Sequence, residues 1–215
     1  MQNLTKGTLI AIEGTDGSGK STLARRLHEL LAKHQFPTVL TKEFGGTPLG
    51  KKIREMLHQR TVPMSNKAEY LLIAADRAQH SAEVVMPSLE KNMLVISDRM
   101  GDSSLVYQGH ARGLDMNMIR AVNFWAMNNK TPDLTLYVRL DLETAMDRVK
   151  TRNKRLTDFE KESTAFFERV INGYDSLYHE RDDVIILDGI LPPEELAQKA
   201  YTEVLQWLEN NESEK

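Results

Sequence analysis

The sequence predicts an α/β fold in which five parallel strands form one sheet that helices cover on both faces. Two features lead to this prediction. Apolar runs too short for helices alternate along the chain with segments of helical apolar spacing, and a glycine-rich segment directly follows the first run. Strands that alternate with helices pair in parallel, because each crossover helix returns the chain to the same end of the sheet. The runs are 9–12, 38–41, 93–97, 134–140 and 184–187.

Apolar residues three or four positions apart mark the helices. Leu23, Leu27, Leu30 and Leu31 indicate a helix that follows the glycine-rich segment and ends near Pro37. Three further helices are expected: one around 53–57, one that Ser65 or Asn66 caps and that runs through 77–85, and one that opens at 192–193. Pro87 is expected to kink or end the second of these.

Composition limits the possible functions. The 215 residues suit a single domain spanning 1–215, and with 40% apolar residues and no long apolar run the chain has no predicted membrane span. The short polar segment before the first strand predicts no targeting peptide, so a cytoplasmic location is expected. A net charge of −3 argues against nucleic acid as the main partner. Without cysteine, and with its six histidines scattered, the chain is expected to hold any metal through oxygen.

The segment from Gly14 to Ser21 matches the phosphate-binding loop pattern G-x-x-x-x-G-K-[ST], between a predicted strand and a predicted helix. In such a loop, backbone N–H groups and the helix N-terminus face the phosphates, while Lys20 reaches the phosphates and the Ser21 hydroxyl reaches Mg²⁺. The motif therefore predicts binding of ATP or GTP with Mg²⁺. The predicted nucleotide-binding residues are Gly14, Thr15, Asp16, Gly17, Ser18, Gly19, Lys20, Ser21 and Thr22.

Asp98 follows the third predicted strand, where a carboxylate supports Mg²⁺ beside such a loop. The stretch from Asp98 to Gly101 also fits D-x-x-G, a GTPase signature. No N-K-x-D pattern occurs, however, because 66–67 and 129–130 read Asn-Lys without the aspartate that should follow. The sequence thus contains no motif that would recognise guanine, and a GTPase is disfavoured.

The stretch from Asp98 to Gly109 resembles the D-R-Y-x-x-S-S-x-A-Y-Q-G pattern of the bacterial thymidylate kinases. Three more stretches agree with this family: the phosphate loop with Glu13 before it, 42–47 (R-E-P-G-G-T in the family) and 71–80 (L-L-F-A-A-D-R-A-Q-H). The resemblance implies a three-layer P-loop kinase fold with a short basic lid at about 148–158. It also implies a homodimer that transfers the γ-phosphate of ATP to dTMP.

The resemblance also implies roles for single residues. Arg99 would bind the acceptor phosphate and bridge toward the γ-phosphate, and Asp16 would contact the sugar 3′-hydroxyl and support the metal through water. Arg77, whose spacing alone fits a solvated helix face, would donate to the thymine carbonyl. Ser104 and Gln108 would meet the base edge, and Tyr107 would crowd the sugar 2′ position and favour deoxyribose.

The predicted lid carries the basic residues Arg148, Lys150, Arg152, Lys154 and Arg155, between the helix after the fourth strand and a helix expected from Phe159. The phosphate loop has Gly17, not an arginine, inside it. The chain therefore resembles the family subtype whose catalytic arginine comes from the lid, and Arg152 is the first candidate. The acceptor phosphate is already anionic near neutral pH, so no general base is expected.

Several positions depart from the family pattern, and they cluster near the expected acceptor. The departures are Ile73 for phenylalanine, Phe44 for proline, Lys42 for arginine, Met100 for tyrosine and Asp158 for arginine. Two alternatives to a dTMP kinase therefore stay open: a kinase for another (deoxy)pyrimidine monophosphate, and a nucleotide-binding module without turnover. The apolar residues Val122, Phe124, Trp125 and Met127 fit a dimer surface or the core equally well.

Overall fold

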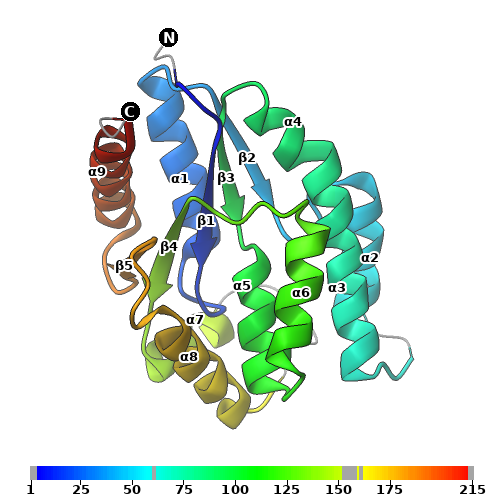
Figure 1. Cartoon of the computed structure of the whole chain (residues 1–215). Coiled ribbons are helices and arrows are strands. Elements are labelled where there is room, and N and C mark those ends of the chain that lie inside the picture. The colour runs from blue at the N-terminus through cyan, green and yellow to red at the C-terminus, as the bar shows by residue number, and fades with distance from the viewer. Residues whose placement is uncertain (1–3, 60–61, 152–158, 160–161, 213–215) are drawn as a thin grey trace.

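The computed structural model describes residues 4–59, 62–151, 159 and 162–212. Its centre is a five-stranded, all-parallel sheet in the order β2-β3-β1-β4-β5 (Figure 1). The prediction of a parallel sheet is thus confirmed. The strands are β1 (Thr8–Glu13), β2 (Thr38–Lys42), β3 (Leu94–Asp98), β4 (Leu134–Arg139) and β5 (Val184–Asp188), each within a few residues of a predicted run.

The strand register brings the functional segments to one edge of the sheet. β1 is buried along its whole length between β3 and β4. Ile12 pairs with Asp98, and Asp98 pairs with Lys42 on its other side. The carboxyl ends of β1, β3 and β2 therefore adjoin, which places the phosphate loop, Asp98 and the segment after β2 together. Ligands of open parallel sheets bind at this edge.

One face of the sheet is covered by α1 (Lys20–Lys33) and α9 (Pro193–Glu212), which lie side by side (Figure 1). Side chains such as Leu27 of α1 and Val204 of α9 pack with Ile10 and Ile12 of β1 in one apolar core. Because alternate strand residues point to opposite faces, Leu9 and Ala11 enter a second cluster on the other side. The sheet is thus the middle of three layers.

The second face is covered by a larger group of helices (Figure 1). The helix α2 packs on α3, α3 packs on α6, and α8 packs along the π-helical segment η2. The bounds are α2 (Pro48–His58), α3 (Asn66–His80), η1 (Ser81–Val85), α4 (Met86–Leu89), α5 (Gly101–Ser104), η2 (Leu105–Ala111), α6 (Met116–Ala126), α7 (Leu142–Thr151) and α8 (Thr164–Tyr178).

Two helix boundaries differ from expectation. The helix that begins at Asn66 passes Pro87 and ends at Leu89, because the π-helical turn of η1 precedes the proline. Proline lacks an N–H group and its ring crowds the preceding turn, which the wider π turn accommodates. The helix expected from Phe159 begins instead at Thr164, where the Ser163 hydroxyl accepts from the backbone N–H of Phe166 and caps it.

The apolar residues of α6, and Met127 directly after it, divide between core and surface. Met127 is buried beneath the sheet and Val122 is half-buried, whereas Phe124 and Trp125 are exposed, Trp125 by 76%. Leu71 of α3 and Met118 of α6 are also exposed. Within the described residues, no helix combines the length and apolar character needed to cross a membrane.

Candidate active site

The phosphate loop runs from Gly14 to Gly19, between β1 and α1. Gly14 and Gly17 have φ values of 152° and 85°, and a Cβ at Gly17 would lie 2.5 Å from the carbonyl oxygen of Ala145. Only glycine fits this position, because both the positive φ and the close backbone exclude a side chain. The hydroxyl oxygens of Thr15 and Ser18 are buried and have no hydrogen-bond partner among the described residues. The loop therefore requires glycine at position 17 and encloses two hydroxyl groups that no described residue satisfies.

Lys20, the first residue of α1, is buried within the loop. Its Nζ donates to the carbonyl oxygen of Thr15 at 3.2 Å and to Oδ1 of Asp16 at 3.3 Å. Burial, and then the neighbouring charge of Arg99, lower the pKa of Lys20, while Asp16 and Asp98 oppose that shift. The ammonium group thus lies at the N-terminus of α1, where a polyphosphate would add the negative charge that stabilises it.

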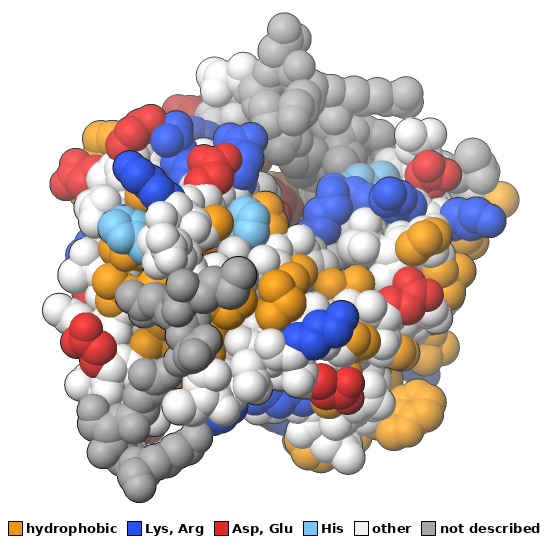
Figure 2. Space-filling view, turned by 90° about the horizontal axis from the view of Figure 1, so that it is seen from above, with side chains coloured by type: hydrophobic (Ala, Val, Ile, Leu, Met, Phe, Trp, Pro, Cys, Tyr) orange, Lys and Arg blue, Asp and Glu red, His pale blue; other side chains and the backbone are white. Residues whose placement is uncertain are grey.

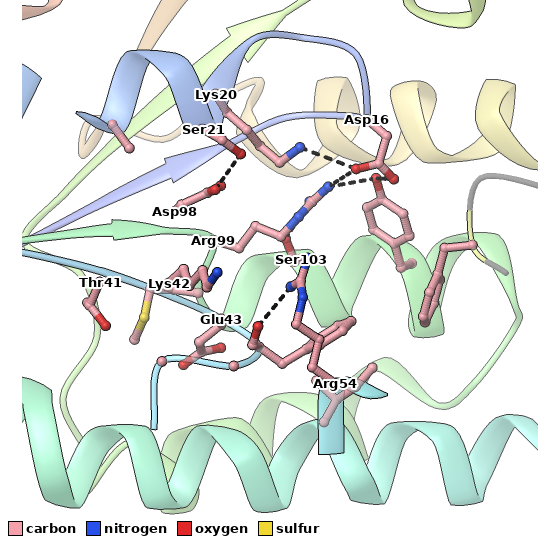
Figure 3. A pocket seen from close by; sticks show the side chains of 18 of the residues that line it. Asp16, Lys20, Ser21, Thr41, Lys42, Glu43, Arg54, Asp98, Arg99 and Ser103 are labelled. Carbon is pink, nitrogen blue, oxygen red and sulfur yellow. Dashed lines mark hydrogen bonds and ion pairs between the residues drawn. The ribbon is translucent and has the colours of Figure 1, made fainter. Parts of the chain in front are cut away.

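Ser21 and Asp98 meet beside the loop (Figure 3). The Ser21 hydroxyl donates to Oδ2 of Asp98 at 2.5 Å, and Oδ1 of Asp98 is buried without a hydrogen-bond partner in the described part of the chain. A hydroxyl and a free carboxylate oxygen are ligands that Mg²⁺ accepts when phosphate oxygens and water complete its shell. Among the described residues, no group of three or more His, Cys, Asp or Glu could hold a metal without such help.

Arg99 connects the phosphate loop with the segment after β3. Its Nη2 donates to Oδ1 of Asp16 at 2.8 Å and to the Tyr107 hydroxyl at 3.2 Å. Its Nη1 donates to the Gly14 carbonyl at 3.0 Å and the Ser103 hydroxyl at 2.9 Å. In Figure 3, Lys20 and Arg99 both point toward Asp16. Burial alone would raise the pKa of Asp16, but Lys20 and Arg99 outweigh it and hold that pKa well below its usual range.

Glu13, at the end of β1, lies behind Arg99. Its carboxylate accepts from the Met100 backbone N–H at 2.8 Å, the Ser103 hydroxyl at 2.6 Å and the Tyr174 hydroxyl at 2.9 Å. Arg99 Nη1 also donates to the Tyr174 hydroxyl at 3.2 Å. Burial raises the pKa of Glu13 to about 6, although Arg99 opposes the shift. The sequence indicated Glu13 only as part of a motif, and Tyr174 had no signal because α8 reaches the site through the fold alone.

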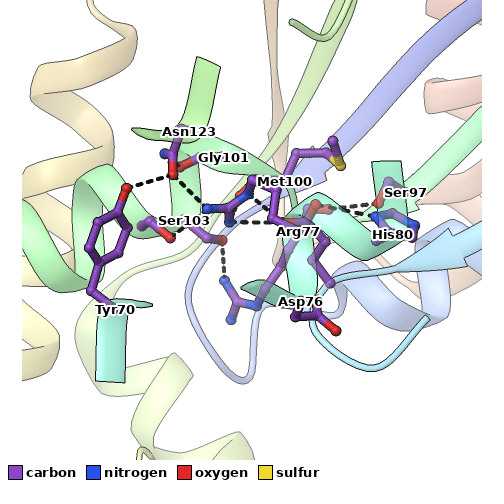
Figure 4. A network of polar contacts seen from close by, with 12 residues as sticks. Tyr70, Asp76, Arg77, His80, Ser97, Met100, Gly101, Ser103 and Asn123 are labelled. Carbon is purple, nitrogen blue, oxygen red and sulfur yellow. Dashed lines mark hydrogen bonds and ion pairs between the residues drawn. The ribbon is translucent and has the colours of Figure 1, made fainter. Parts of the chain in front are cut away.

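A second network surrounds Arg77 of α3 (Figure 4). Arg77 is 1% exposed, so the solvated helix face that spacing alone suggested is wrong. Its Nε donates to Glu43 Oε2 at 2.8 Å, and Nη1 donates to the Ser104 hydroxyl at 3.2 Å and to Asn123 Oδ1 at 2.6 Å. The pKa of Glu43 is lowered overall, because the contacts with Arg77 and His80 outweigh burial, which by itself would raise it. Sequence reasoning missed Glu43 and Asn123.

Tyr107 and Gln108 lie on η2, next to this network. The Arg99 guanidinium stands 5.0 Å from the centre of the Tyr107 ring, and burial raises the pKa of the Tyr107 hydroxyl despite Arg99. The Gln108 side chain is buried and its Nε2 donates to Oε1 of Glu69 at 2.9 Å. The π-helical turn of η2 therefore presents consecutive side chains toward the same region.

One cleft of about 980 Å³ lies among these residues, and Glu13, Asn123 and Tyr174 do not line it. Of the predicted site residues it brings together Asp16, Gly17, Gly19, Lys20, Ser21, Thr22, Arg77, Asp98, Arg99, Ser104, Tyr107 and Gln108. Gly14, Thr15 and Ser18 belong to the phosphate loop but do not line the cleft. Arg148 lines it and donates to the Gly189 carbonyl at 2.8 Å. Arg152, Lys154 and Arg155, and most of the predicted lid at 148–158, lie outside the described residues.

Arg54 of α2 is a cleft residue that sequence reasoning missed. Its Nη1 donates to the Phe44 carbonyl at 2.9 Å, and its guanidinium stands 5.5 Å from the centre of the Phe44 ring. Burial lowers the pKa of Arg54. The charge of Asp98 opposes this shift and the charge of Arg99 adds to it, so Arg54 lies in the same electrostatic environment as these two residues. The apolar spacing around 53–57 predicted only a helix and assigned no role to Arg54, which the fold places in the cleft lining.

The departures from the family pattern have different structural settings. Ile73 and Phe44 lie in one apolar cluster with Phe159, and all three line the cleft. The Met100 side chain is buried in the core under the sheet, and its backbone carbonyl accepts from Arg77 Nη2 at 3.3 Å. Lys42 is exposed at the cleft edge. Asp158 lies outside the described residues.

The fold and the site together define the class of this protein. The sheet is parallel, a phosphate loop follows one strand and a carboxylate follows its neighbour, and the cleft joins cations to a buried polar pocket. These features are those of a P-loop nucleoside monophosphate kinase. A family model described as thymidylate kinase matches residues 12–200. The chain belongs to the thymidylate kinase family.

Individual relatives agree with the family model. The chain is 40% identical to a thymidylate kinase of Halothermothrix orenii over 201 residues, which covers 93% of this chain and 97% of the relative. It is 40% identical to one of Carboxydothermus hydrogenoformans over 89% of this chain and 93% of the relative. It is 41% identical to one of Alkalilimnicola ehrlichii over 81% of both chains. The similarity thus extends over nearly the whole chain.

Proposed function

We propose that this chain is a dTMP kinase that transfers the γ-phosphate of ATP to dTMP and releases dTDP and ADP. The observation that carries the proposal is the position of Arg99, which contacts the phosphate-loop residue Asp16 and the η2 residue Tyr107 within one cleft. A phosphoryl donor on the loop and an acceptor beside η2 would meet at this guanidinium. Family membership supplies the identity of the two substrates.

On the donor side, the proposed ATP site is the loop 14–19 with Lys20, Ser21 and Thr22 of α1. Inward backbone N–H groups and the start of α1 attract phosphates, and Lys20 adds a point charge. Asp98 and Ser21 would hold Mg²⁺ that arrives with ATP, as the free Oδ1 of Asp98 supports. When bound, Mg²⁺ neutralises charge that develops between the donor phosphates.

On the acceptor side, Arg77, Ser104 and Gln108 would meet the thymine edge, while Tyr107 and Asp16 would meet the sugar. Buried donors and acceptors in a fixed arrangement suit recognition of a base edge, because a mismatched base leaves them unpaired. Arg54 faces the same environment as Arg99 and Asp98. We therefore add it as a second cation for the acceptor phosphate.

In the transfer, an oxygen of the dTMP phosphate forms a bond to the γ-phosphorus as the bond from the γ-phosphorus to the β,γ-bridging oxygen breaks. The electron pair of that bond leaves with ADP. The acceptor oxygen carries a negative charge already, so no residue must remove a proton. Arg99 and Lys20 hold two polyanions in line and stabilise the charge of the transition state, and positioning plus electrostatics supply most of the acceleration.

Water must be kept from the γ-phosphate, or ATP would be hydrolysed. Arg148 lines the cleft at the end of α7 and marks the start of the basic segment expected to close it. Arg152 remains the predicted catalytic arginine of the lid.

The single domain spanning 1–215 and the cytoplasmic location also stay predictions, as does the absence of nucleic acid as a partner. On the face seen in Figure 2, positive and negative side chains are interspersed.

A homodimer is part of the proposal. Leu71, Met118, Phe124 and Trp125 are exposed on α3 and α6, which pack on each other. Large apolar side chains gathered on neighbouring helices are typical of protein interfaces. Sedimentation or size-exclusion measurements on the wild type and on Trp125→Glu would test it, with a monomeric variant expected.

The test of function is ADP formation from ATP and Mg²⁺ with dTMP, dUMP, TMP, dCMP, dGMP and AMP, each supplied separately, beside Lys20→Ala as an inactive control. Turnover that is fastest with dTMP supports the proposal. A preference for another monophosphate would keep the phosphotransfer and overturn the base assignments. ATP binding without turnover on any acceptor would favour a nucleotide-binding module and overturn the proposed activity.

A further inference from the structure

A buried carboxylate stands behind the cleft and holds one of its lining residues. Glu69 of α3 is 1% exposed and does not line the cleft, whereas Gln108 does. Gln108 Nε2 donates to Glu69 Oε1 at 2.9 Å, and Arg112 Nε donates to the same oxygen at 2.8 Å. Arg112 also pairs with Glu162 at 2.8 Å and lies 4.9 Å from the Phe166 ring centre, so the guanidinium is itself held.

This contact determines which end of the Gln108 carboxamide faces the cleft. A carboxylate accepts hydrogen bonds and donates none, so the NH₂ group of Gln108 must point to Glu69. Its Oε1 is then the end left over, and no donor among the described residues reaches it. Gln108 consequently offers an acceptor to a ligand in the cleft. Without Glu69, the two ends of the carboxamide would be free to exchange.

Ser104, four residues earlier, offers the opposite polarity. Its hydroxyl oxygen accepts from Arg77 Nη1 at 3.2 Å, so the hydroxyl hydrogen remains free to donate. Ser104 and Gln108 both line the cleft. A donor and an acceptor close together match the thymine edge, where the C4 carbonyl accepts and the neighbouring N3–H donates. Cytosine presents the reverse pattern, an amine donor beside an N3 acceptor.

We propose that Glu69, supported by Arg112, is a positioning residue that selects dTMP against cytosine-type monophosphates by fixing the orientation of Gln108. This inference rests on the proposed function, since it assumes that the base of the acceptor lies beside Gln108 and Ser104. Glu69 touches no substrate in this arrangement. It acts through the carboxamide that it holds.

The test compares dTMP with 5-methyl-dCMP, because these two acceptors share the 5-methyl group and the sugar and differ only at the edge in question. Glu69→Gln keeps the size of the side chain but lets position 69 donate as well as accept. The ratio of kcat/KM for dTMP over 5-methyl-dCMP is expected to fall about tenfold or more. Most of the change should lie in KM, because Arg99 and Lys20 are untouched.

Glu162→Gln is the matched control, since it alters the other carboxylate that Arg112 contacts and leaves the contact between Glu69 and Gln108 in place. The control is expected to keep the wild-type ratio. A double-mutant cycle with Gln108→Met adds a second readout. If Glu69 acts through Gln108, Glu69→Gln should not change the ratio further in the Gln108→Met background.

Equal losses for both acceptors in Glu69→Gln would mean a merely structural role and would overturn the inference, as would a further fall in the double variant. If Glu69→Gln does not fold by circular dichroism, Glu69→Asp takes its place, because it keeps the negative charge near Arg112 and moves the oxygen that Gln108 and Arg112 share back by one methylene. A wild-type enzyme without dTMP turnover would instead overturn the proposed function itself.

Discussion

The carboxylate of Asp16 and the guanidinium of Arg99 are joined at 2.8 Å although 83 residues separate them in the chain. Asp16 also contacts Lys20, so one carboxylate lies between the two cations proposed to handle the phosphates. The pairing keeps both cations oriented in the absence of phosphate. Pre-orientation matters because catalysis of this kind depends on charges that need not rearrange during the reaction.

Asp16→Asn is expected to lower kcat/KM for dTMP by about a hundredfold or more, because it removes the charge that orients Arg99 and Lys20. Steady-state ADP release measures the effect. Glu29→Gln, an exposed change on α1, is the control and should leave kcat/KM near that of the wild type. Wild-type activity in Asp16→Asn would contradict the proposed role.

Asp98→Asn is expected to raise the Mg²⁺ concentration needed for half-maximal activity by about tenfold or more, since one carboxylate ligand loses its charge. Titration of activity with Mg²⁺ at fixed ATP measures the shift. Binding of ATP without Mg²⁺, followed calorimetrically, should change little. An unchanged Mg²⁺ requirement would exclude Asp98 as a ligand.

The Glu13 carboxylate predicts a specific pH dependence of stability. Burial raises its pKa from 4.5 to about 6 in the folded chain, so the folded chain holds the proton of Glu13 more tightly than the unfolded chain does. The free energy of unfolding that this group contributes therefore falls as the pH rises from about 4.5 through 6 and is constant above that window. A shift of this size corresponds to about 2 kcal/mol.

Urea unfolding of the wild type and of Glu13→Gln at pH 4.5 and 7.5 checks this dependence. The stability of the wild type relative to Glu13→Gln should decrease by about 1.6 kcal/mol between the two pH values, because Glu13 of the unfolded chain is already half ionised at pH 4.5 and glutamine cannot ionise. A difference that does not vary with pH would show that Glu13 titrates normally in the folded state.

Tyr107 is expected to discriminate deoxyribose from ribose through its ring and to support Arg99 through its hydroxyl. Tyr107→Phe should therefore lower kcat but keep the preference for dTMP over TMP, whereas Tyr107→Ala should lower that preference as well. Turnover of dTMP and of TMP, measured side by side with both variants, checks this expectation. An unaltered preference in Tyr107→Ala would assign the discrimination to another residue.

The parallel sheet and the phosphate loop could be predicted because their signals are local. Apolar runs of four to seven residues between segments of helical spacing indicate buried strands that alternate with amphipathic helices. The phosphate loop is a contiguous motif. Arg77 illustrates the limit of such signals. Its spacing on α3 fits a solvated face, and only the packing of Glu43, Ser104 and Asn123 around it makes the side chain a buried one.

Tyr174, Asn123 and Arg54 could not be found from the sequence, because no motif includes them and each reaches the site through the packing of its own helix. Glu43 lies within the 42–47 stretch, but that stretch did not predict its contact with Arg77. Tyr174 contacts Glu13 across 161 residues of chain. Whether a tyrosine on α8 faces the core or the site depends on how α8 packs against η2, which local spacing does not encode. The same holds for Glu69, which is one acidic residue among many until the fold sets Gln108 and Arg112 beside it.

By itself, the sequence determined the class of fold, the place of the phosphate loop and, through resemblance, the family. Local periodicity and contiguous motifs carry that information, since they follow from hydrogen bonding and burial within short segments. Only the tertiary structure decided which polar groups face the cleft and which stand behind it. Those choices depend on contacts between residues far apart in the chain, where each buried donor or acceptor needs a partner that another element supplies.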